Sequence, residues 1–357
     1  MMTETRIEKL RESLESIGAD AFLVSTPENR RYLSGFTGSA GHLILTHEDA
    51  ILATDFRYIQ QAERQATGYQ VLRTAGGYHW LAEIAKELGA RRIAFESDNM
   101  TVAAHESATS VLRNLVPETR PELVATEGVV DGLRAVKDAG EIELLRKAVE
   151  IADTALGQVA PTIEPGMTEA QVAWAIEKAM RELGAESNAF DIIVGAGVNG
   201  ALPHHRADET VIQSGDPVVV DMGATYQGYR SDLTRTFSVG GYDDRFREVY
   251  DIVLGAQLAA EGAVRPGITG GEIDTVARDF IDDAGYGDKF GHGLGHGIGL
   301  AVHELPRIGS GSLDVLDDGS VFTIEPGIYL PDWGGVRIED MVSIEAGEVH
   351  VLSRSVK

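Results

Sequence analysis

Three histidines lie in and just after a glycine-rich segment, residues 291–299 (GHGLGHGIG). His292 and His296 alternate with five glycines in the nine residues of that segment, and His303 follows it. Glycine allows the backbone to pass close to another group, and imidazole is the commonest side-chain metal ligand and a proton carrier near neutral pH. A glycine-rich turn with surface histidines explains any one of these residues but not the cluster. We therefore interpret the segment as part of a metal-binding or catalytic site.

Four acidic residues recur at equivalent positions of an internal repeat. Residues 165–168 (PGMT) and 266–269 (PGIT) each lie between two predicted amphipathic helices, with the threonine placed to cap the second helix. Residues 215–221 and 319–325 then each form a predicted apolar strand that ends in a carboxylate, and a second strand carries another acid. The four acids are Asp221, Asp232, Glu325 and Glu339.

A pseudo-twofold axis between the two repeats would bring these four carboxylates together. Any one acid alone can be a strand end that faces solvent, but the symmetric placement of all four argues against that interpretation. Buried like charges need a large opposing charge, because each unpaired charge costs several kcal/mol. Two divalent cations would supply it, with His296 as a fifth ligand, and such a set suits ions about 3.5 Å apart. The histidines also pair, since His204 precedes Asp221 and His303 precedes Glu325.

The composition limits both the partners and the metal ligands. The chain of 357 residues has a formal charge of −25 and a sequence pI of about 4.7, which argues against nucleic acid or an anionic membrane as a partner. It contains no cysteine, so a metal must be held by imidazole and carboxylate groups, which favours Mn, Co, Fe or Zn. The first residues lack the apolar core of a signal peptide, and no apolar run is long enough to span a membrane. We expect a cytoplasmic location.

The order of predicted helices and strands divides the chain into two domains. Residues 1–128 alternate helices with short apolar strands, as in an α/β domain. A strongly charged helix over residues 134–148 is predicted to open the second domain, residues 129–357. Within the first domain, Arg57 and Tyr58 are candidate substrate-binding residues, although the same segment can equally be a strand end that caps a helix.

With these residues in place, the chain resembles the proline-specific metallopeptidases of the pita-bread fold, the group that contains aminopeptidase P, prolidase and methionine aminopeptidase. The resemblance covers essentially the whole chain. It implies an α/β (α+β) protein, with an N-terminal creatinase/prolidase-like α/β domain followed by a pseudo-twofold pita-bread catalytic domain. Residues 34–41 (SGFTGSAG) and 54–58 (TDFRY) look most like short bacterial Xaa-Pro aminopeptidases. The motifs of the second domain are residues 220–224 (VDMGA), 231–237 (SDLTRTF), 291–299 (GHGLGHGIG), 325–329 (EPGIY) and 335–340 (GVRIED).

The resemblance also implies a role for each candidate metal ligand. Asp221 would bind one metal ion, and Asp232 and Glu339 would bridge both ions. His296 and Glu325 would bind the second ion. Glu325 would in addition act as the base that moves a proton from the attacking water to the leaving nitrogen.

Other residues are expected to contact the substrate or to orient the ligands. His204 and His303 would hold the substrate and donate hydrogen bonds to the tetrahedral intermediate. His292 and Arg337 would orient the metal ligands. His205 is expected to be only a polar neighbour. The cations that could clamp the carboxylate of a substrate proline are Arg57, Arg307 and Arg337.

The implied reaction is metal-dependent hydrolysis of the bond between an N-terminal residue and a following proline. The cofactor would be two divalent metal ions per chain, with Mn favoured and Co, Zn and Fe as alternatives. The partners would be a proline-containing peptide substrate and a second copy of the chain in a homodimer, with neither nucleic acid nor a membrane. We expect an Xaa-Pro aminopeptidase, with an Xaa-Pro dipeptidase (prolidase) as the alternative. A non-catalytic binding module or a creatinase-like amidinohydrolase would not need all five metal ligands present here.

Overall fold

Two compact units make up the computed structural model, which describes residues 2–357. The first unit ends at Arg134 and the second comprises Ala135–Lys357, so the division lies a few residues beyond the boundary expected from the sequence. The reason lies in helix α6 (Val129–Ala135), where the Arg134 guanidinium donates hydrogen bonds to Asn29 and Asp131 at 2.7 and 2.9 Å. These contacts hold the end of this helix to the first unit.

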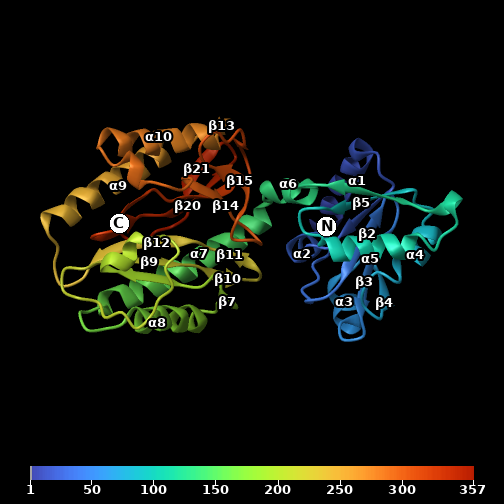
Figure 1. The fold of residues 1–357 in the computed structure, drawn as a ribbon, viewed down its shortest axis with the longest axis horizontal. Helices are drawn as coiled ribbons and strands as arrows, with labels where there is room; N and C mark the ends of the chain where they lie inside the picture. Colours follow the sequence, from blue (N-terminus) through green and yellow to red (C-terminus); the bar gives the residue numbers. More distant parts are fainter. Residues whose placement is uncertain (1) are drawn as a thin grey trace. The chain divides into compact units, whose positions relative to one another are not determined.

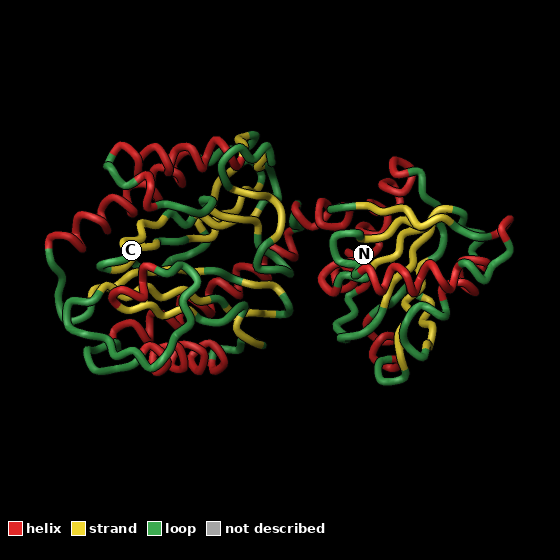
Figure 2. The backbone as a smooth tube through the Cα atoms, viewed as in Figure 1, coloured by secondary structure: helices red, strands yellow, loops and turns green. Residues whose placement is uncertain are grey.

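A six-stranded mixed sheet forms the centre of the first unit, where Figure 2 draws its strands in yellow. Its strand order is β4-β3-β2-β1-β5-β6. The pairs β1–β2 and β2–β3 are antiparallel, and the pairs β1–β5, β3–β4 and β5–β6 are parallel. Helices alternate with these strands along the chain, as expected for an α/β domain. The strands are β1 (Ala21–Val24), β2 (His42–Thr46), β3 (Ala50–Asp55), β4 (Gln70–Thr74), β5 (Arg92–Glu96) and β6 (Glu122–Thr126). The helices are α1 (Met2–Ile17), α2 (Pro27–Ser34), α3 (Ile59–Gln65), α4 (Leu81–Glu87) and α5 (Val102–Leu112).

The prediction of a single charged helix over residues 134–148 is wrong, because a short non-helical segment there separates two helices. Helix α6 ends at Ala135, and α7 runs over Ala139–Val159. Asp138 caps α7, since its carboxylate accepts a hydrogen bond from the backbone N–H of Glu141 at 2.9 Å. Gly140 therefore lies in the first turn of α7, where a poor helix former costs less than in a helix interior.

The internal repeat of the second unit is visible in the starts of its helices. Thr168 caps α8 (Glu169–Glu182) and Thr269 caps α10 (Gly270–Asp283), each in a capping box with the residue three positions later. The backbone angles of the two threonines are almost the same, φ −92° and ψ 156° for Thr168 against φ −91° and ψ 154° for Thr269. Each half therefore contains a helix pair, α7 with α8 and α9 (Asp244–Ala263) with α10 (Figure 1).

Each half also contains an antiparallel strand pair, as the sequence predicted. β9 (Pro217–Met222) pairs with β12 (Leu233–Ser238), and β17 (Val321–Ile324) pairs with β20 (Asp340–Glu345). The pairs belong to sheets of order β12-β9-β8 and β15-β14-β17-β20-β21. In Figure 1 the green helices α7 and α8 cover one side of these strands, and the yellow-to-orange helices α9 and α10 cover the other. The remaining strands are β7 (Ser187–Asn188), β8 (Ile193–Ala196), β10 (Ala224–Tyr226), β11 (Tyr229–Arg230), β13 (Ile268–Thr269), β14 (Gly295–Gly297), β15 (Glu304–Ile308), β16 (Val315–Leu316), β18 (Gly327–Leu330), β19 (Gly334–Arg337) and β21 (Glu348–Val351).

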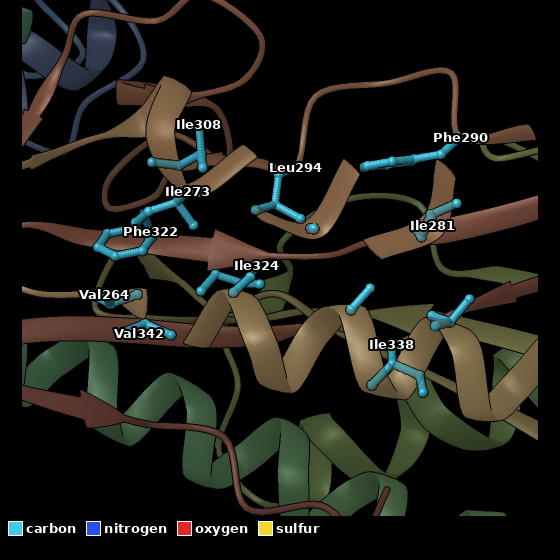
Figure 3. Close-up of a cluster of buried hydrophobic side chains, with 14 of the residues drawn as sticks. Val264, Ile273, Ile281, Phe290, Leu294, Ile308, Phe322, Ile324, Ile338 and Val342 are labelled. Carbon is cyan, nitrogen blue, oxygen red and sulfur yellow. The ribbon is translucent and has the colours of Figure 1, made fainter. Parts of the chain in front are cut away.

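A separate apolar core supports the strands of each half. In the first half, buried side chains of the helices such as Leu156 and Ile176 pack with Val218 of β9. In the second half, Ile273 of α10 and Phe322 of β17 belong to one buried cluster (Figure 3). The strands on which the acids stand are thus fixed against helices by close packing. None of the helices within residues 2–357 combines the length and the apolar character needed to cross a bilayer.

The capping box of α10 leads to a prediction for stability. Replacing Thr269 with alanine removes the side chain that accepts a hydrogen bond from the backbone N–H of Glu272 at 3.2 Å. We expect a loss of about 1 kcal/mol in the free energy of unfolding, measured by urea denaturation of the whole chain. Thr275→Ala is the matched control, because that hydroxyl only donates to the carbonyl of Gly271 within the same helix. An equal loss in both variants would contradict a capping role.

Candidate metal centre

The four acids of the repeat converge on one cavity of about 1310 Å³ in the second unit. Asp221 lies within β9, whereas Asp232 immediately precedes β12. Glu325 immediately follows β17, and Glu339 immediately precedes β20. Three of the four acids therefore stand just outside the strands on which the sequence placed them. The backbone N–H of Glu339 donates to the carbonyl of Thr234 at 3.1 Å, which joins the two strand pairs beside the acids.

His296 lies among these acids. Its Nε2 is 3.5 Å from Oε1 of Glu325 and 3.7 Å from Oδ2 of Asp232. Ligand atoms of Asp232, His296 and Glu339 all lie within 4.8 Å of one another. Oδ1 of Asp221 is buried and has no hydrogen-bond partner among the described residues. A buried carboxylate oxygen without a donor, next to an imidazole and further carboxylates, fits a divalent cation as the missing partner.

The protonation state of His296 suits a metal ligand. Nδ1 lies 3.1 Å from the carbonyl of Gly297, so this nitrogen carries the proton and Nε2 presents a lone pair to the acids. Burial lowers the pKa of His296 to about 4, so the ring is neutral at pH 7. The backbone N–H of His296 also donates to Oγ1 of Thr323 at 3.1 Å, which fixes the residue on the neighbouring strand.

The glycines around His296 serve close packing of strands. A Cβ on Gly295 would lie 2.1 Å from the carbonyl oxygen of Thr323 in β17. A Cβ on Gly297 would lie 2.1 Å from the carbonyl oxygen of Leu305 in β15. Any side chain at either position would therefore push β14 away from its two neighbours. The spacing of the motif follows from this close approach.

Mutual repulsion in the cavity changes the proton affinity of the acids. Burial, followed by repulsion from neighbouring carboxylates, raises the pKa of Asp232 well above its usual range. The same two causes raise the pKa of Glu325 well above its ordinary value. For Glu339, burial and the charge of Asp221 raise the pKa to about 8. Either protons or divalent metal ions would relieve this repulsion, so the arrangement favours a bound cation.

Among residues 2–357, Arg337 is the one cationic side chain in direct contact with the four acids. Its Nη2 donates to Oδ2 of Asp221 at 2.7 Å, and its Nε donates to the hydroxyl of Thr234 at 3.2 Å. Oγ1 of Thr234 in turn donates to Oε2 of Glu339 at 2.7 Å. Burial by itself lowers the pKa of Arg337, but the combined effect of neighbours such as Tyr329 and Asp221 is larger and raises it above its usual value. The guanidinium therefore stays charged. Arg337 thus contacts Asp221 directly and Glu339 through Thr234, so its guanidinium is occupied by protein groups, and its role in orienting the metal ligands remains a prediction.

Tyr329 is a site residue to which we had assigned no role from the sequence. Its hydroxyl lies 2.8 Å from Nε2 of His292 and accepts a hydrogen bond from Arg337 at 3.0 Å. Burial raises the pKa of Tyr329 to about 12, so the hydroxyl keeps its proton. Nδ1 of His292 lies 2.7 Å from the carbonyl of Gly293, so both ring nitrogens already have protein partners. His292 is therefore linked to Arg337 through Tyr329 and offers no free ligand atom, and its role in orienting the metal ligands remains a prediction. The sequence signal that could have identified Tyr329 was its position at the end of the EPGIY motif.

His303 faces the same cavity from the segment that follows β14. Its ring centroid lies 4.3 Å from that of His296, in an edge-on arrangement. Burial lowers the pKa of His303, so it is mainly neutral at pH 7 and can donate one hydrogen bond. The segment is held from behind by a buried ion pair of 2.9 Å between Lys137 and Glu304. The carboxylate of Glu304 also accepts a hydrogen bond from the backbone N–H of Ala301 at 3.2 Å.

His204 also lines this cavity and is exposed, without a hydrogen-bond partner among residues 2–357. The next residue, His205, has Nε2 2.7 Å from Oε2 of Glu169. The other oxygen of Glu169 accepts hydrogen bonds from the backbone N–H of Ala196 and the amide of Asn199, at 2.8 and 3.0 Å. Glu169 and His205 are close to Asp208, but the oxygens of Glu169 are already satisfied, so we assign no metal there. Glu169, which the sequence did not single out, anchors the loop that presents His204.

The remaining predicted cations occupy different places. Arg307 of β15 is exposed, lines the cavity and has no ion pair with any described residue. Arg57 belongs to the first unit, where its guanidinium binds both oxygens of Asp55 at 2.9 and 2.7 Å. The hydroxyl of Tyr58, in the same unit, lies 2.7 Å from that of Ser39. A role of Arg57 and Tyr58 in substrate binding remains a prediction.

The geometry defines a class of protein. Oxygen and nitrogen donors of the kinds that divalent metal ions prefer surround one open cavity, and four further imidazoles and buried hydrogen-bond donors line it as well. Such a centre suits metal-assisted hydrolysis.

The comparisons with known proteins agree with this class. The model of metallopeptidase family M24 matches residues 143–346, and the creatinase/prolidase N-terminal domain model matches residues 6–136. The chain therefore belongs to metallopeptidase family M24. It has the pita-bread fold of these enzymes and is a metallo-exopeptidase.

Three relatives illustrate the similarity. The structure of an Xaa-Pro dipeptidase from Bacillus anthracis is 41% identical, with a TM-score of 0.95 over 99% of this chain and 98% of that chain. The structure of an X-Pro aminopeptidase from Thermotoga maritima is 37% identical, with a TM-score of 0.89 over 98% of this chain and 97% of that chain. An Xaa-Pro dipeptidase of Pyrococcus furiosus is 38% identical over 95% of this chain and 94% of its own length.

The raised pKa of Glu339 leads to a prediction for the protein after chelation of metal. Between its ordinary pKa of 4.5 and its folded pKa of about 8, the folded chain holds a proton that the unfolded chain releases. Stability should therefore fall as pH rises from 7.5 to 8.5, a range in which histidine, with an ordinary pKa of 6.5, is almost entirely neutral in the unfolded chain as well. Urea denaturation of chelator-treated protein measures this slope, and Glu339→Gln should reduce it, although Asp232 and Glu325, whose pKa values are also raised, still contribute. Saturating Mn²⁺ should add more stability at pH 8.5 than at pH 7, because the ion binds the deprotonated acids. Equal slopes for the two proteins would contradict the pKa assignment.

Proposed function

We propose that this metallopeptidase is a dinuclear Xaa-Pro dipeptidase, which hydrolyses the bond between an N-terminal residue and a C-terminal proline. The observation that supports it most directly is that two arginines, Arg230 and Arg307, line the cavity without an ion-pair partner among the described residues. Unpaired cations near a centre for hydrolysis suit a small substrate that carries a free carboxylate. This conclusion replaces our first expectation of an aminopeptidase.

The proposed metal ligands are the five residues expected from the sequence. Asp221 would hold one ion, and Asp232 and Glu339 would bridge two ions. His296 and Glu325 would hold the second ion, for which neutral His296 offers Nε2. Two divalent ions, with Mn as the favoured metal, would acidify a water molecule and polarise the scissile carbonyl. Four carboxylates and one Arg337 leave an excess of negative charge that a pair of dications offsets.

The side chains around the metal site supply proton transfer and hydrogen bonding. Glu325, whose pKa is raised by burial, can take a proton from the attacking water and give it to the proline nitrogen. His204 and His303 line the cavity and would donate hydrogen bonds to the oxygen of the tetrahedral intermediate. Tyr329 and Arg337 keep Asp221 and His292 in place while the charge on the substrate changes.

The relatives also favour the dipeptidase over the aminopeptidase. Relatives named Xaa-Pro dipeptidase are 41% and 38% identical to this chain over nearly its whole length. The X-Pro aminopeptidase from Thermotoga maritima is 37% identical to this chain, so aminopeptidase activity remains the alternative. An aminopeptidase must leave the region after the proline open for the rest of the peptide, whereas a dipeptidase gains affinity from a cation there.

A substrate panel tests the proposed function. With Mn²⁺-reconstituted protein, kcat/KM for Leu-Pro should exceed that for the tripeptide Leu-Pro-Ala by at least about tenfold, the value of a lost charge-assisted hydrogen bond. Leu-Ala serves as the control for the requirement for proline and should be cut poorly. Comparable rates for Leu-Pro and Leu-Pro-Ala would make the protein an aminopeptidase. Full activity of metal-free, chelator-treated protein would refute the metal mechanism.

The assignment of bridging carboxylates leads to a separate prediction. Asp232→Asn removes one charge from the buried centre and should lower both metal content and kcat/KM, the latter by at least about a hundredfold. Asp191→Asn is the matched control, because Asp191 lines the same cavity but is 83% exposed and lies 3.6 Å from Arg206. Metal analysis and Leu-Pro hydrolysis measure both variants. Similar losses in the two variants would remove Asp232 from the set of ligands.

A further inference from the structure

We propose that Arg235 is a positioning residue for the metal centre: it fixes Glu339 from behind and thereby sets the affinity for the pair of metal ions. The inference rests on the proposed function, because Glu339 bridges two ions only in that proposal. Arg235 belongs to β12 and is 1% exposed, and it is not among the residues that line the metal cavity. Any effect of Arg235 on metal binding must therefore act through the groups that it contacts.

Glu339 needs support from outside its own sheet. The ladder between β17 and β20 ends at the pair Ile324–Asp340, so Glu339 lies just beyond it. The backbone N–H of Glu339 donates to the carbonyl of Thr234 at 3.1 Å, and its carboxylate accepts a hydrogen bond from the hydroxyl of Thr234 at 2.7 Å. The carbonyl of Glu339 accepts a hydrogen bond from Nη1 of Arg235 at 2.6 Å. Two consecutive residues of the first half thus hold this proposed ligand, which belongs to the second half.

The guanidinium of Arg235 joins the two halves at this point. Nη1 also donates to the carbonyl of Thr234 at 2.9 Å, so one nitrogen binds a carbonyl from each half. Nη2 donates to Oδ1 of Asp340 at 2.7 Å. The other proposed bridging ligand crosses the same boundary, because the backbone N–H of Asp232 donates to Sδ of Met341 at 3.3 Å. The separation of the two bridging carboxylates therefore depends on the spacing between β12 and β20.

Residues 353–357 lie beside β12 and β20 and hold the guanidinium in place (Figure 1). Nε of Arg235 donates to the carbonyls of Ser355 and Val356 at 3.3 and 3.1 Å, and Nη2 donates to that of Ser355 at 2.7 Å. Asp153 of α7 fixes this segment, since its carboxylate accepts a hydrogen bond from the backbone N–H of Ser355 at 2.9 Å. All five N–H donors of the guanidinium are thus occupied, which leaves it a single orientation.

Asp340, the acid partner of Arg235, is also held from several sides. Its side chain is completely buried, and Oδ2 accepts a hydrogen bond from the amide of Gln257 in α9 at 2.9 Å. Lys357 forms an ion pair with the same oxygen. A buried ion pair contributes little net stability, because desolvation of both charges offsets their attraction. The fixed geometry of this pair is then its main contribution, and the chain passes that geometry on to the neighbouring Glu339.

Mn²⁺ binding by the metal-free protein provides the test. Arg235→Lys keeps the charge beside Asp340 but offers three donors in place of five, so the Glu339 carbonyl loses its fixed donor. We expect the variant to fold and its Kd for Mn²⁺, measured by isothermal titration calorimetry, to rise about 10- to 100-fold. The EPR signal of an exchange-coupled Mn²⁺ pair should also weaken at concentrations that saturate the wild-type protein. At saturating Mn²⁺, KM for Leu-Pro should stay close to that of the wild type, because Arg235 does not line the cavity.

Two control variants separate positioning from a general loss of stability. Arg146→Lys changes an ion pair at the other end of β20, where Arg146 binds Glu345 at 2.5 Å. Ile281→Ala opens a cavity in the apolar core of the second half and should lower the free energy of unfolding in urea. Both variants should keep the wild-type Kd for Mn²⁺. A Kd in Ile281→Ala as high as in Arg235→Lys would overturn the positioning role, because loss of stability alone would then explain the effect.

The outcomes also separate this inference from the proposed function. A wild-type Kd and an undiminished EPR signal in Arg235→Lys would overturn the role of Arg235 alone. A wild-type protein that binds no pair of Mn²⁺ ions would overturn the dinuclear centre and this inference together. If Arg235→Lys fails to fold, Arg235→Met combined with Asp340→Asn takes its place, because removal of both charges leaves neither unpaired. This double variant should show the same rise in Kd, and an unchanged Kd would overturn the proposal.

Discussion

Repulsion between buried carboxylates is the constraint on which the second unit depends. Asp221, Asp232, Glu325 and Glu339 share one cavity, and burial raises the pKa of three of them. The protein offsets part of this charge through Arg337, whose guanidinium binds Asp221 at 2.7 Å. The remainder calls for bound cations, so the arrangement that weakens the metal-free fold is also the one that creates affinity for metal. The packed helices and strands of each half supply the stability that allows such a cluster to persist.

The repeat explains how two unlike sets of side chains reach one centre. Each half has a helix pair with a threonine capping box and an antiparallel strand pair, so each half delivers two acids. Each half also presents one histidine from a loop, and a buried acid fixes each loop. Glu169 binds the loop of His204, and Glu304, paired with Lys137, binds the segment of His303. The halves differ where chemistry requires it, because only the second half supplies His296, Tyr329 and Arg337.

The charges of the cavity serve two separate purposes. Arg337 is buried and bound by Asp221, Tyr329 and Thr234, so its role is to position the groups that hold metal. Arg230 and Arg307 line the cavity and have no acid partner among the described residues, so their positive charge can attract a negatively charged group of a ligand. A substrate with a terminal carboxylate complements this second pair, and the apolar lining near Phe190 complements a proline ring.

The features that the sequence determined by itself are local or periodic. Threonine caps, apolar strands ending in acids and the alternation of helices with strands depend on residues a few positions apart, and the structure contains them. The sequence did not predict the end of one helix just before α7, because a helical pattern of residues continues on both sides of Asp138 and obscures the N-cap signal of that residue. Tertiary structure alone decided which arginines have an acid partner among the described residues. Arg337 and Asp221 are 116 residues apart, and the Ala189 carbonyl that orients Arg230 comes from a segment 41 residues away. Such pairings depend on how the two halves pack, and a single sequence carries no local signal for them.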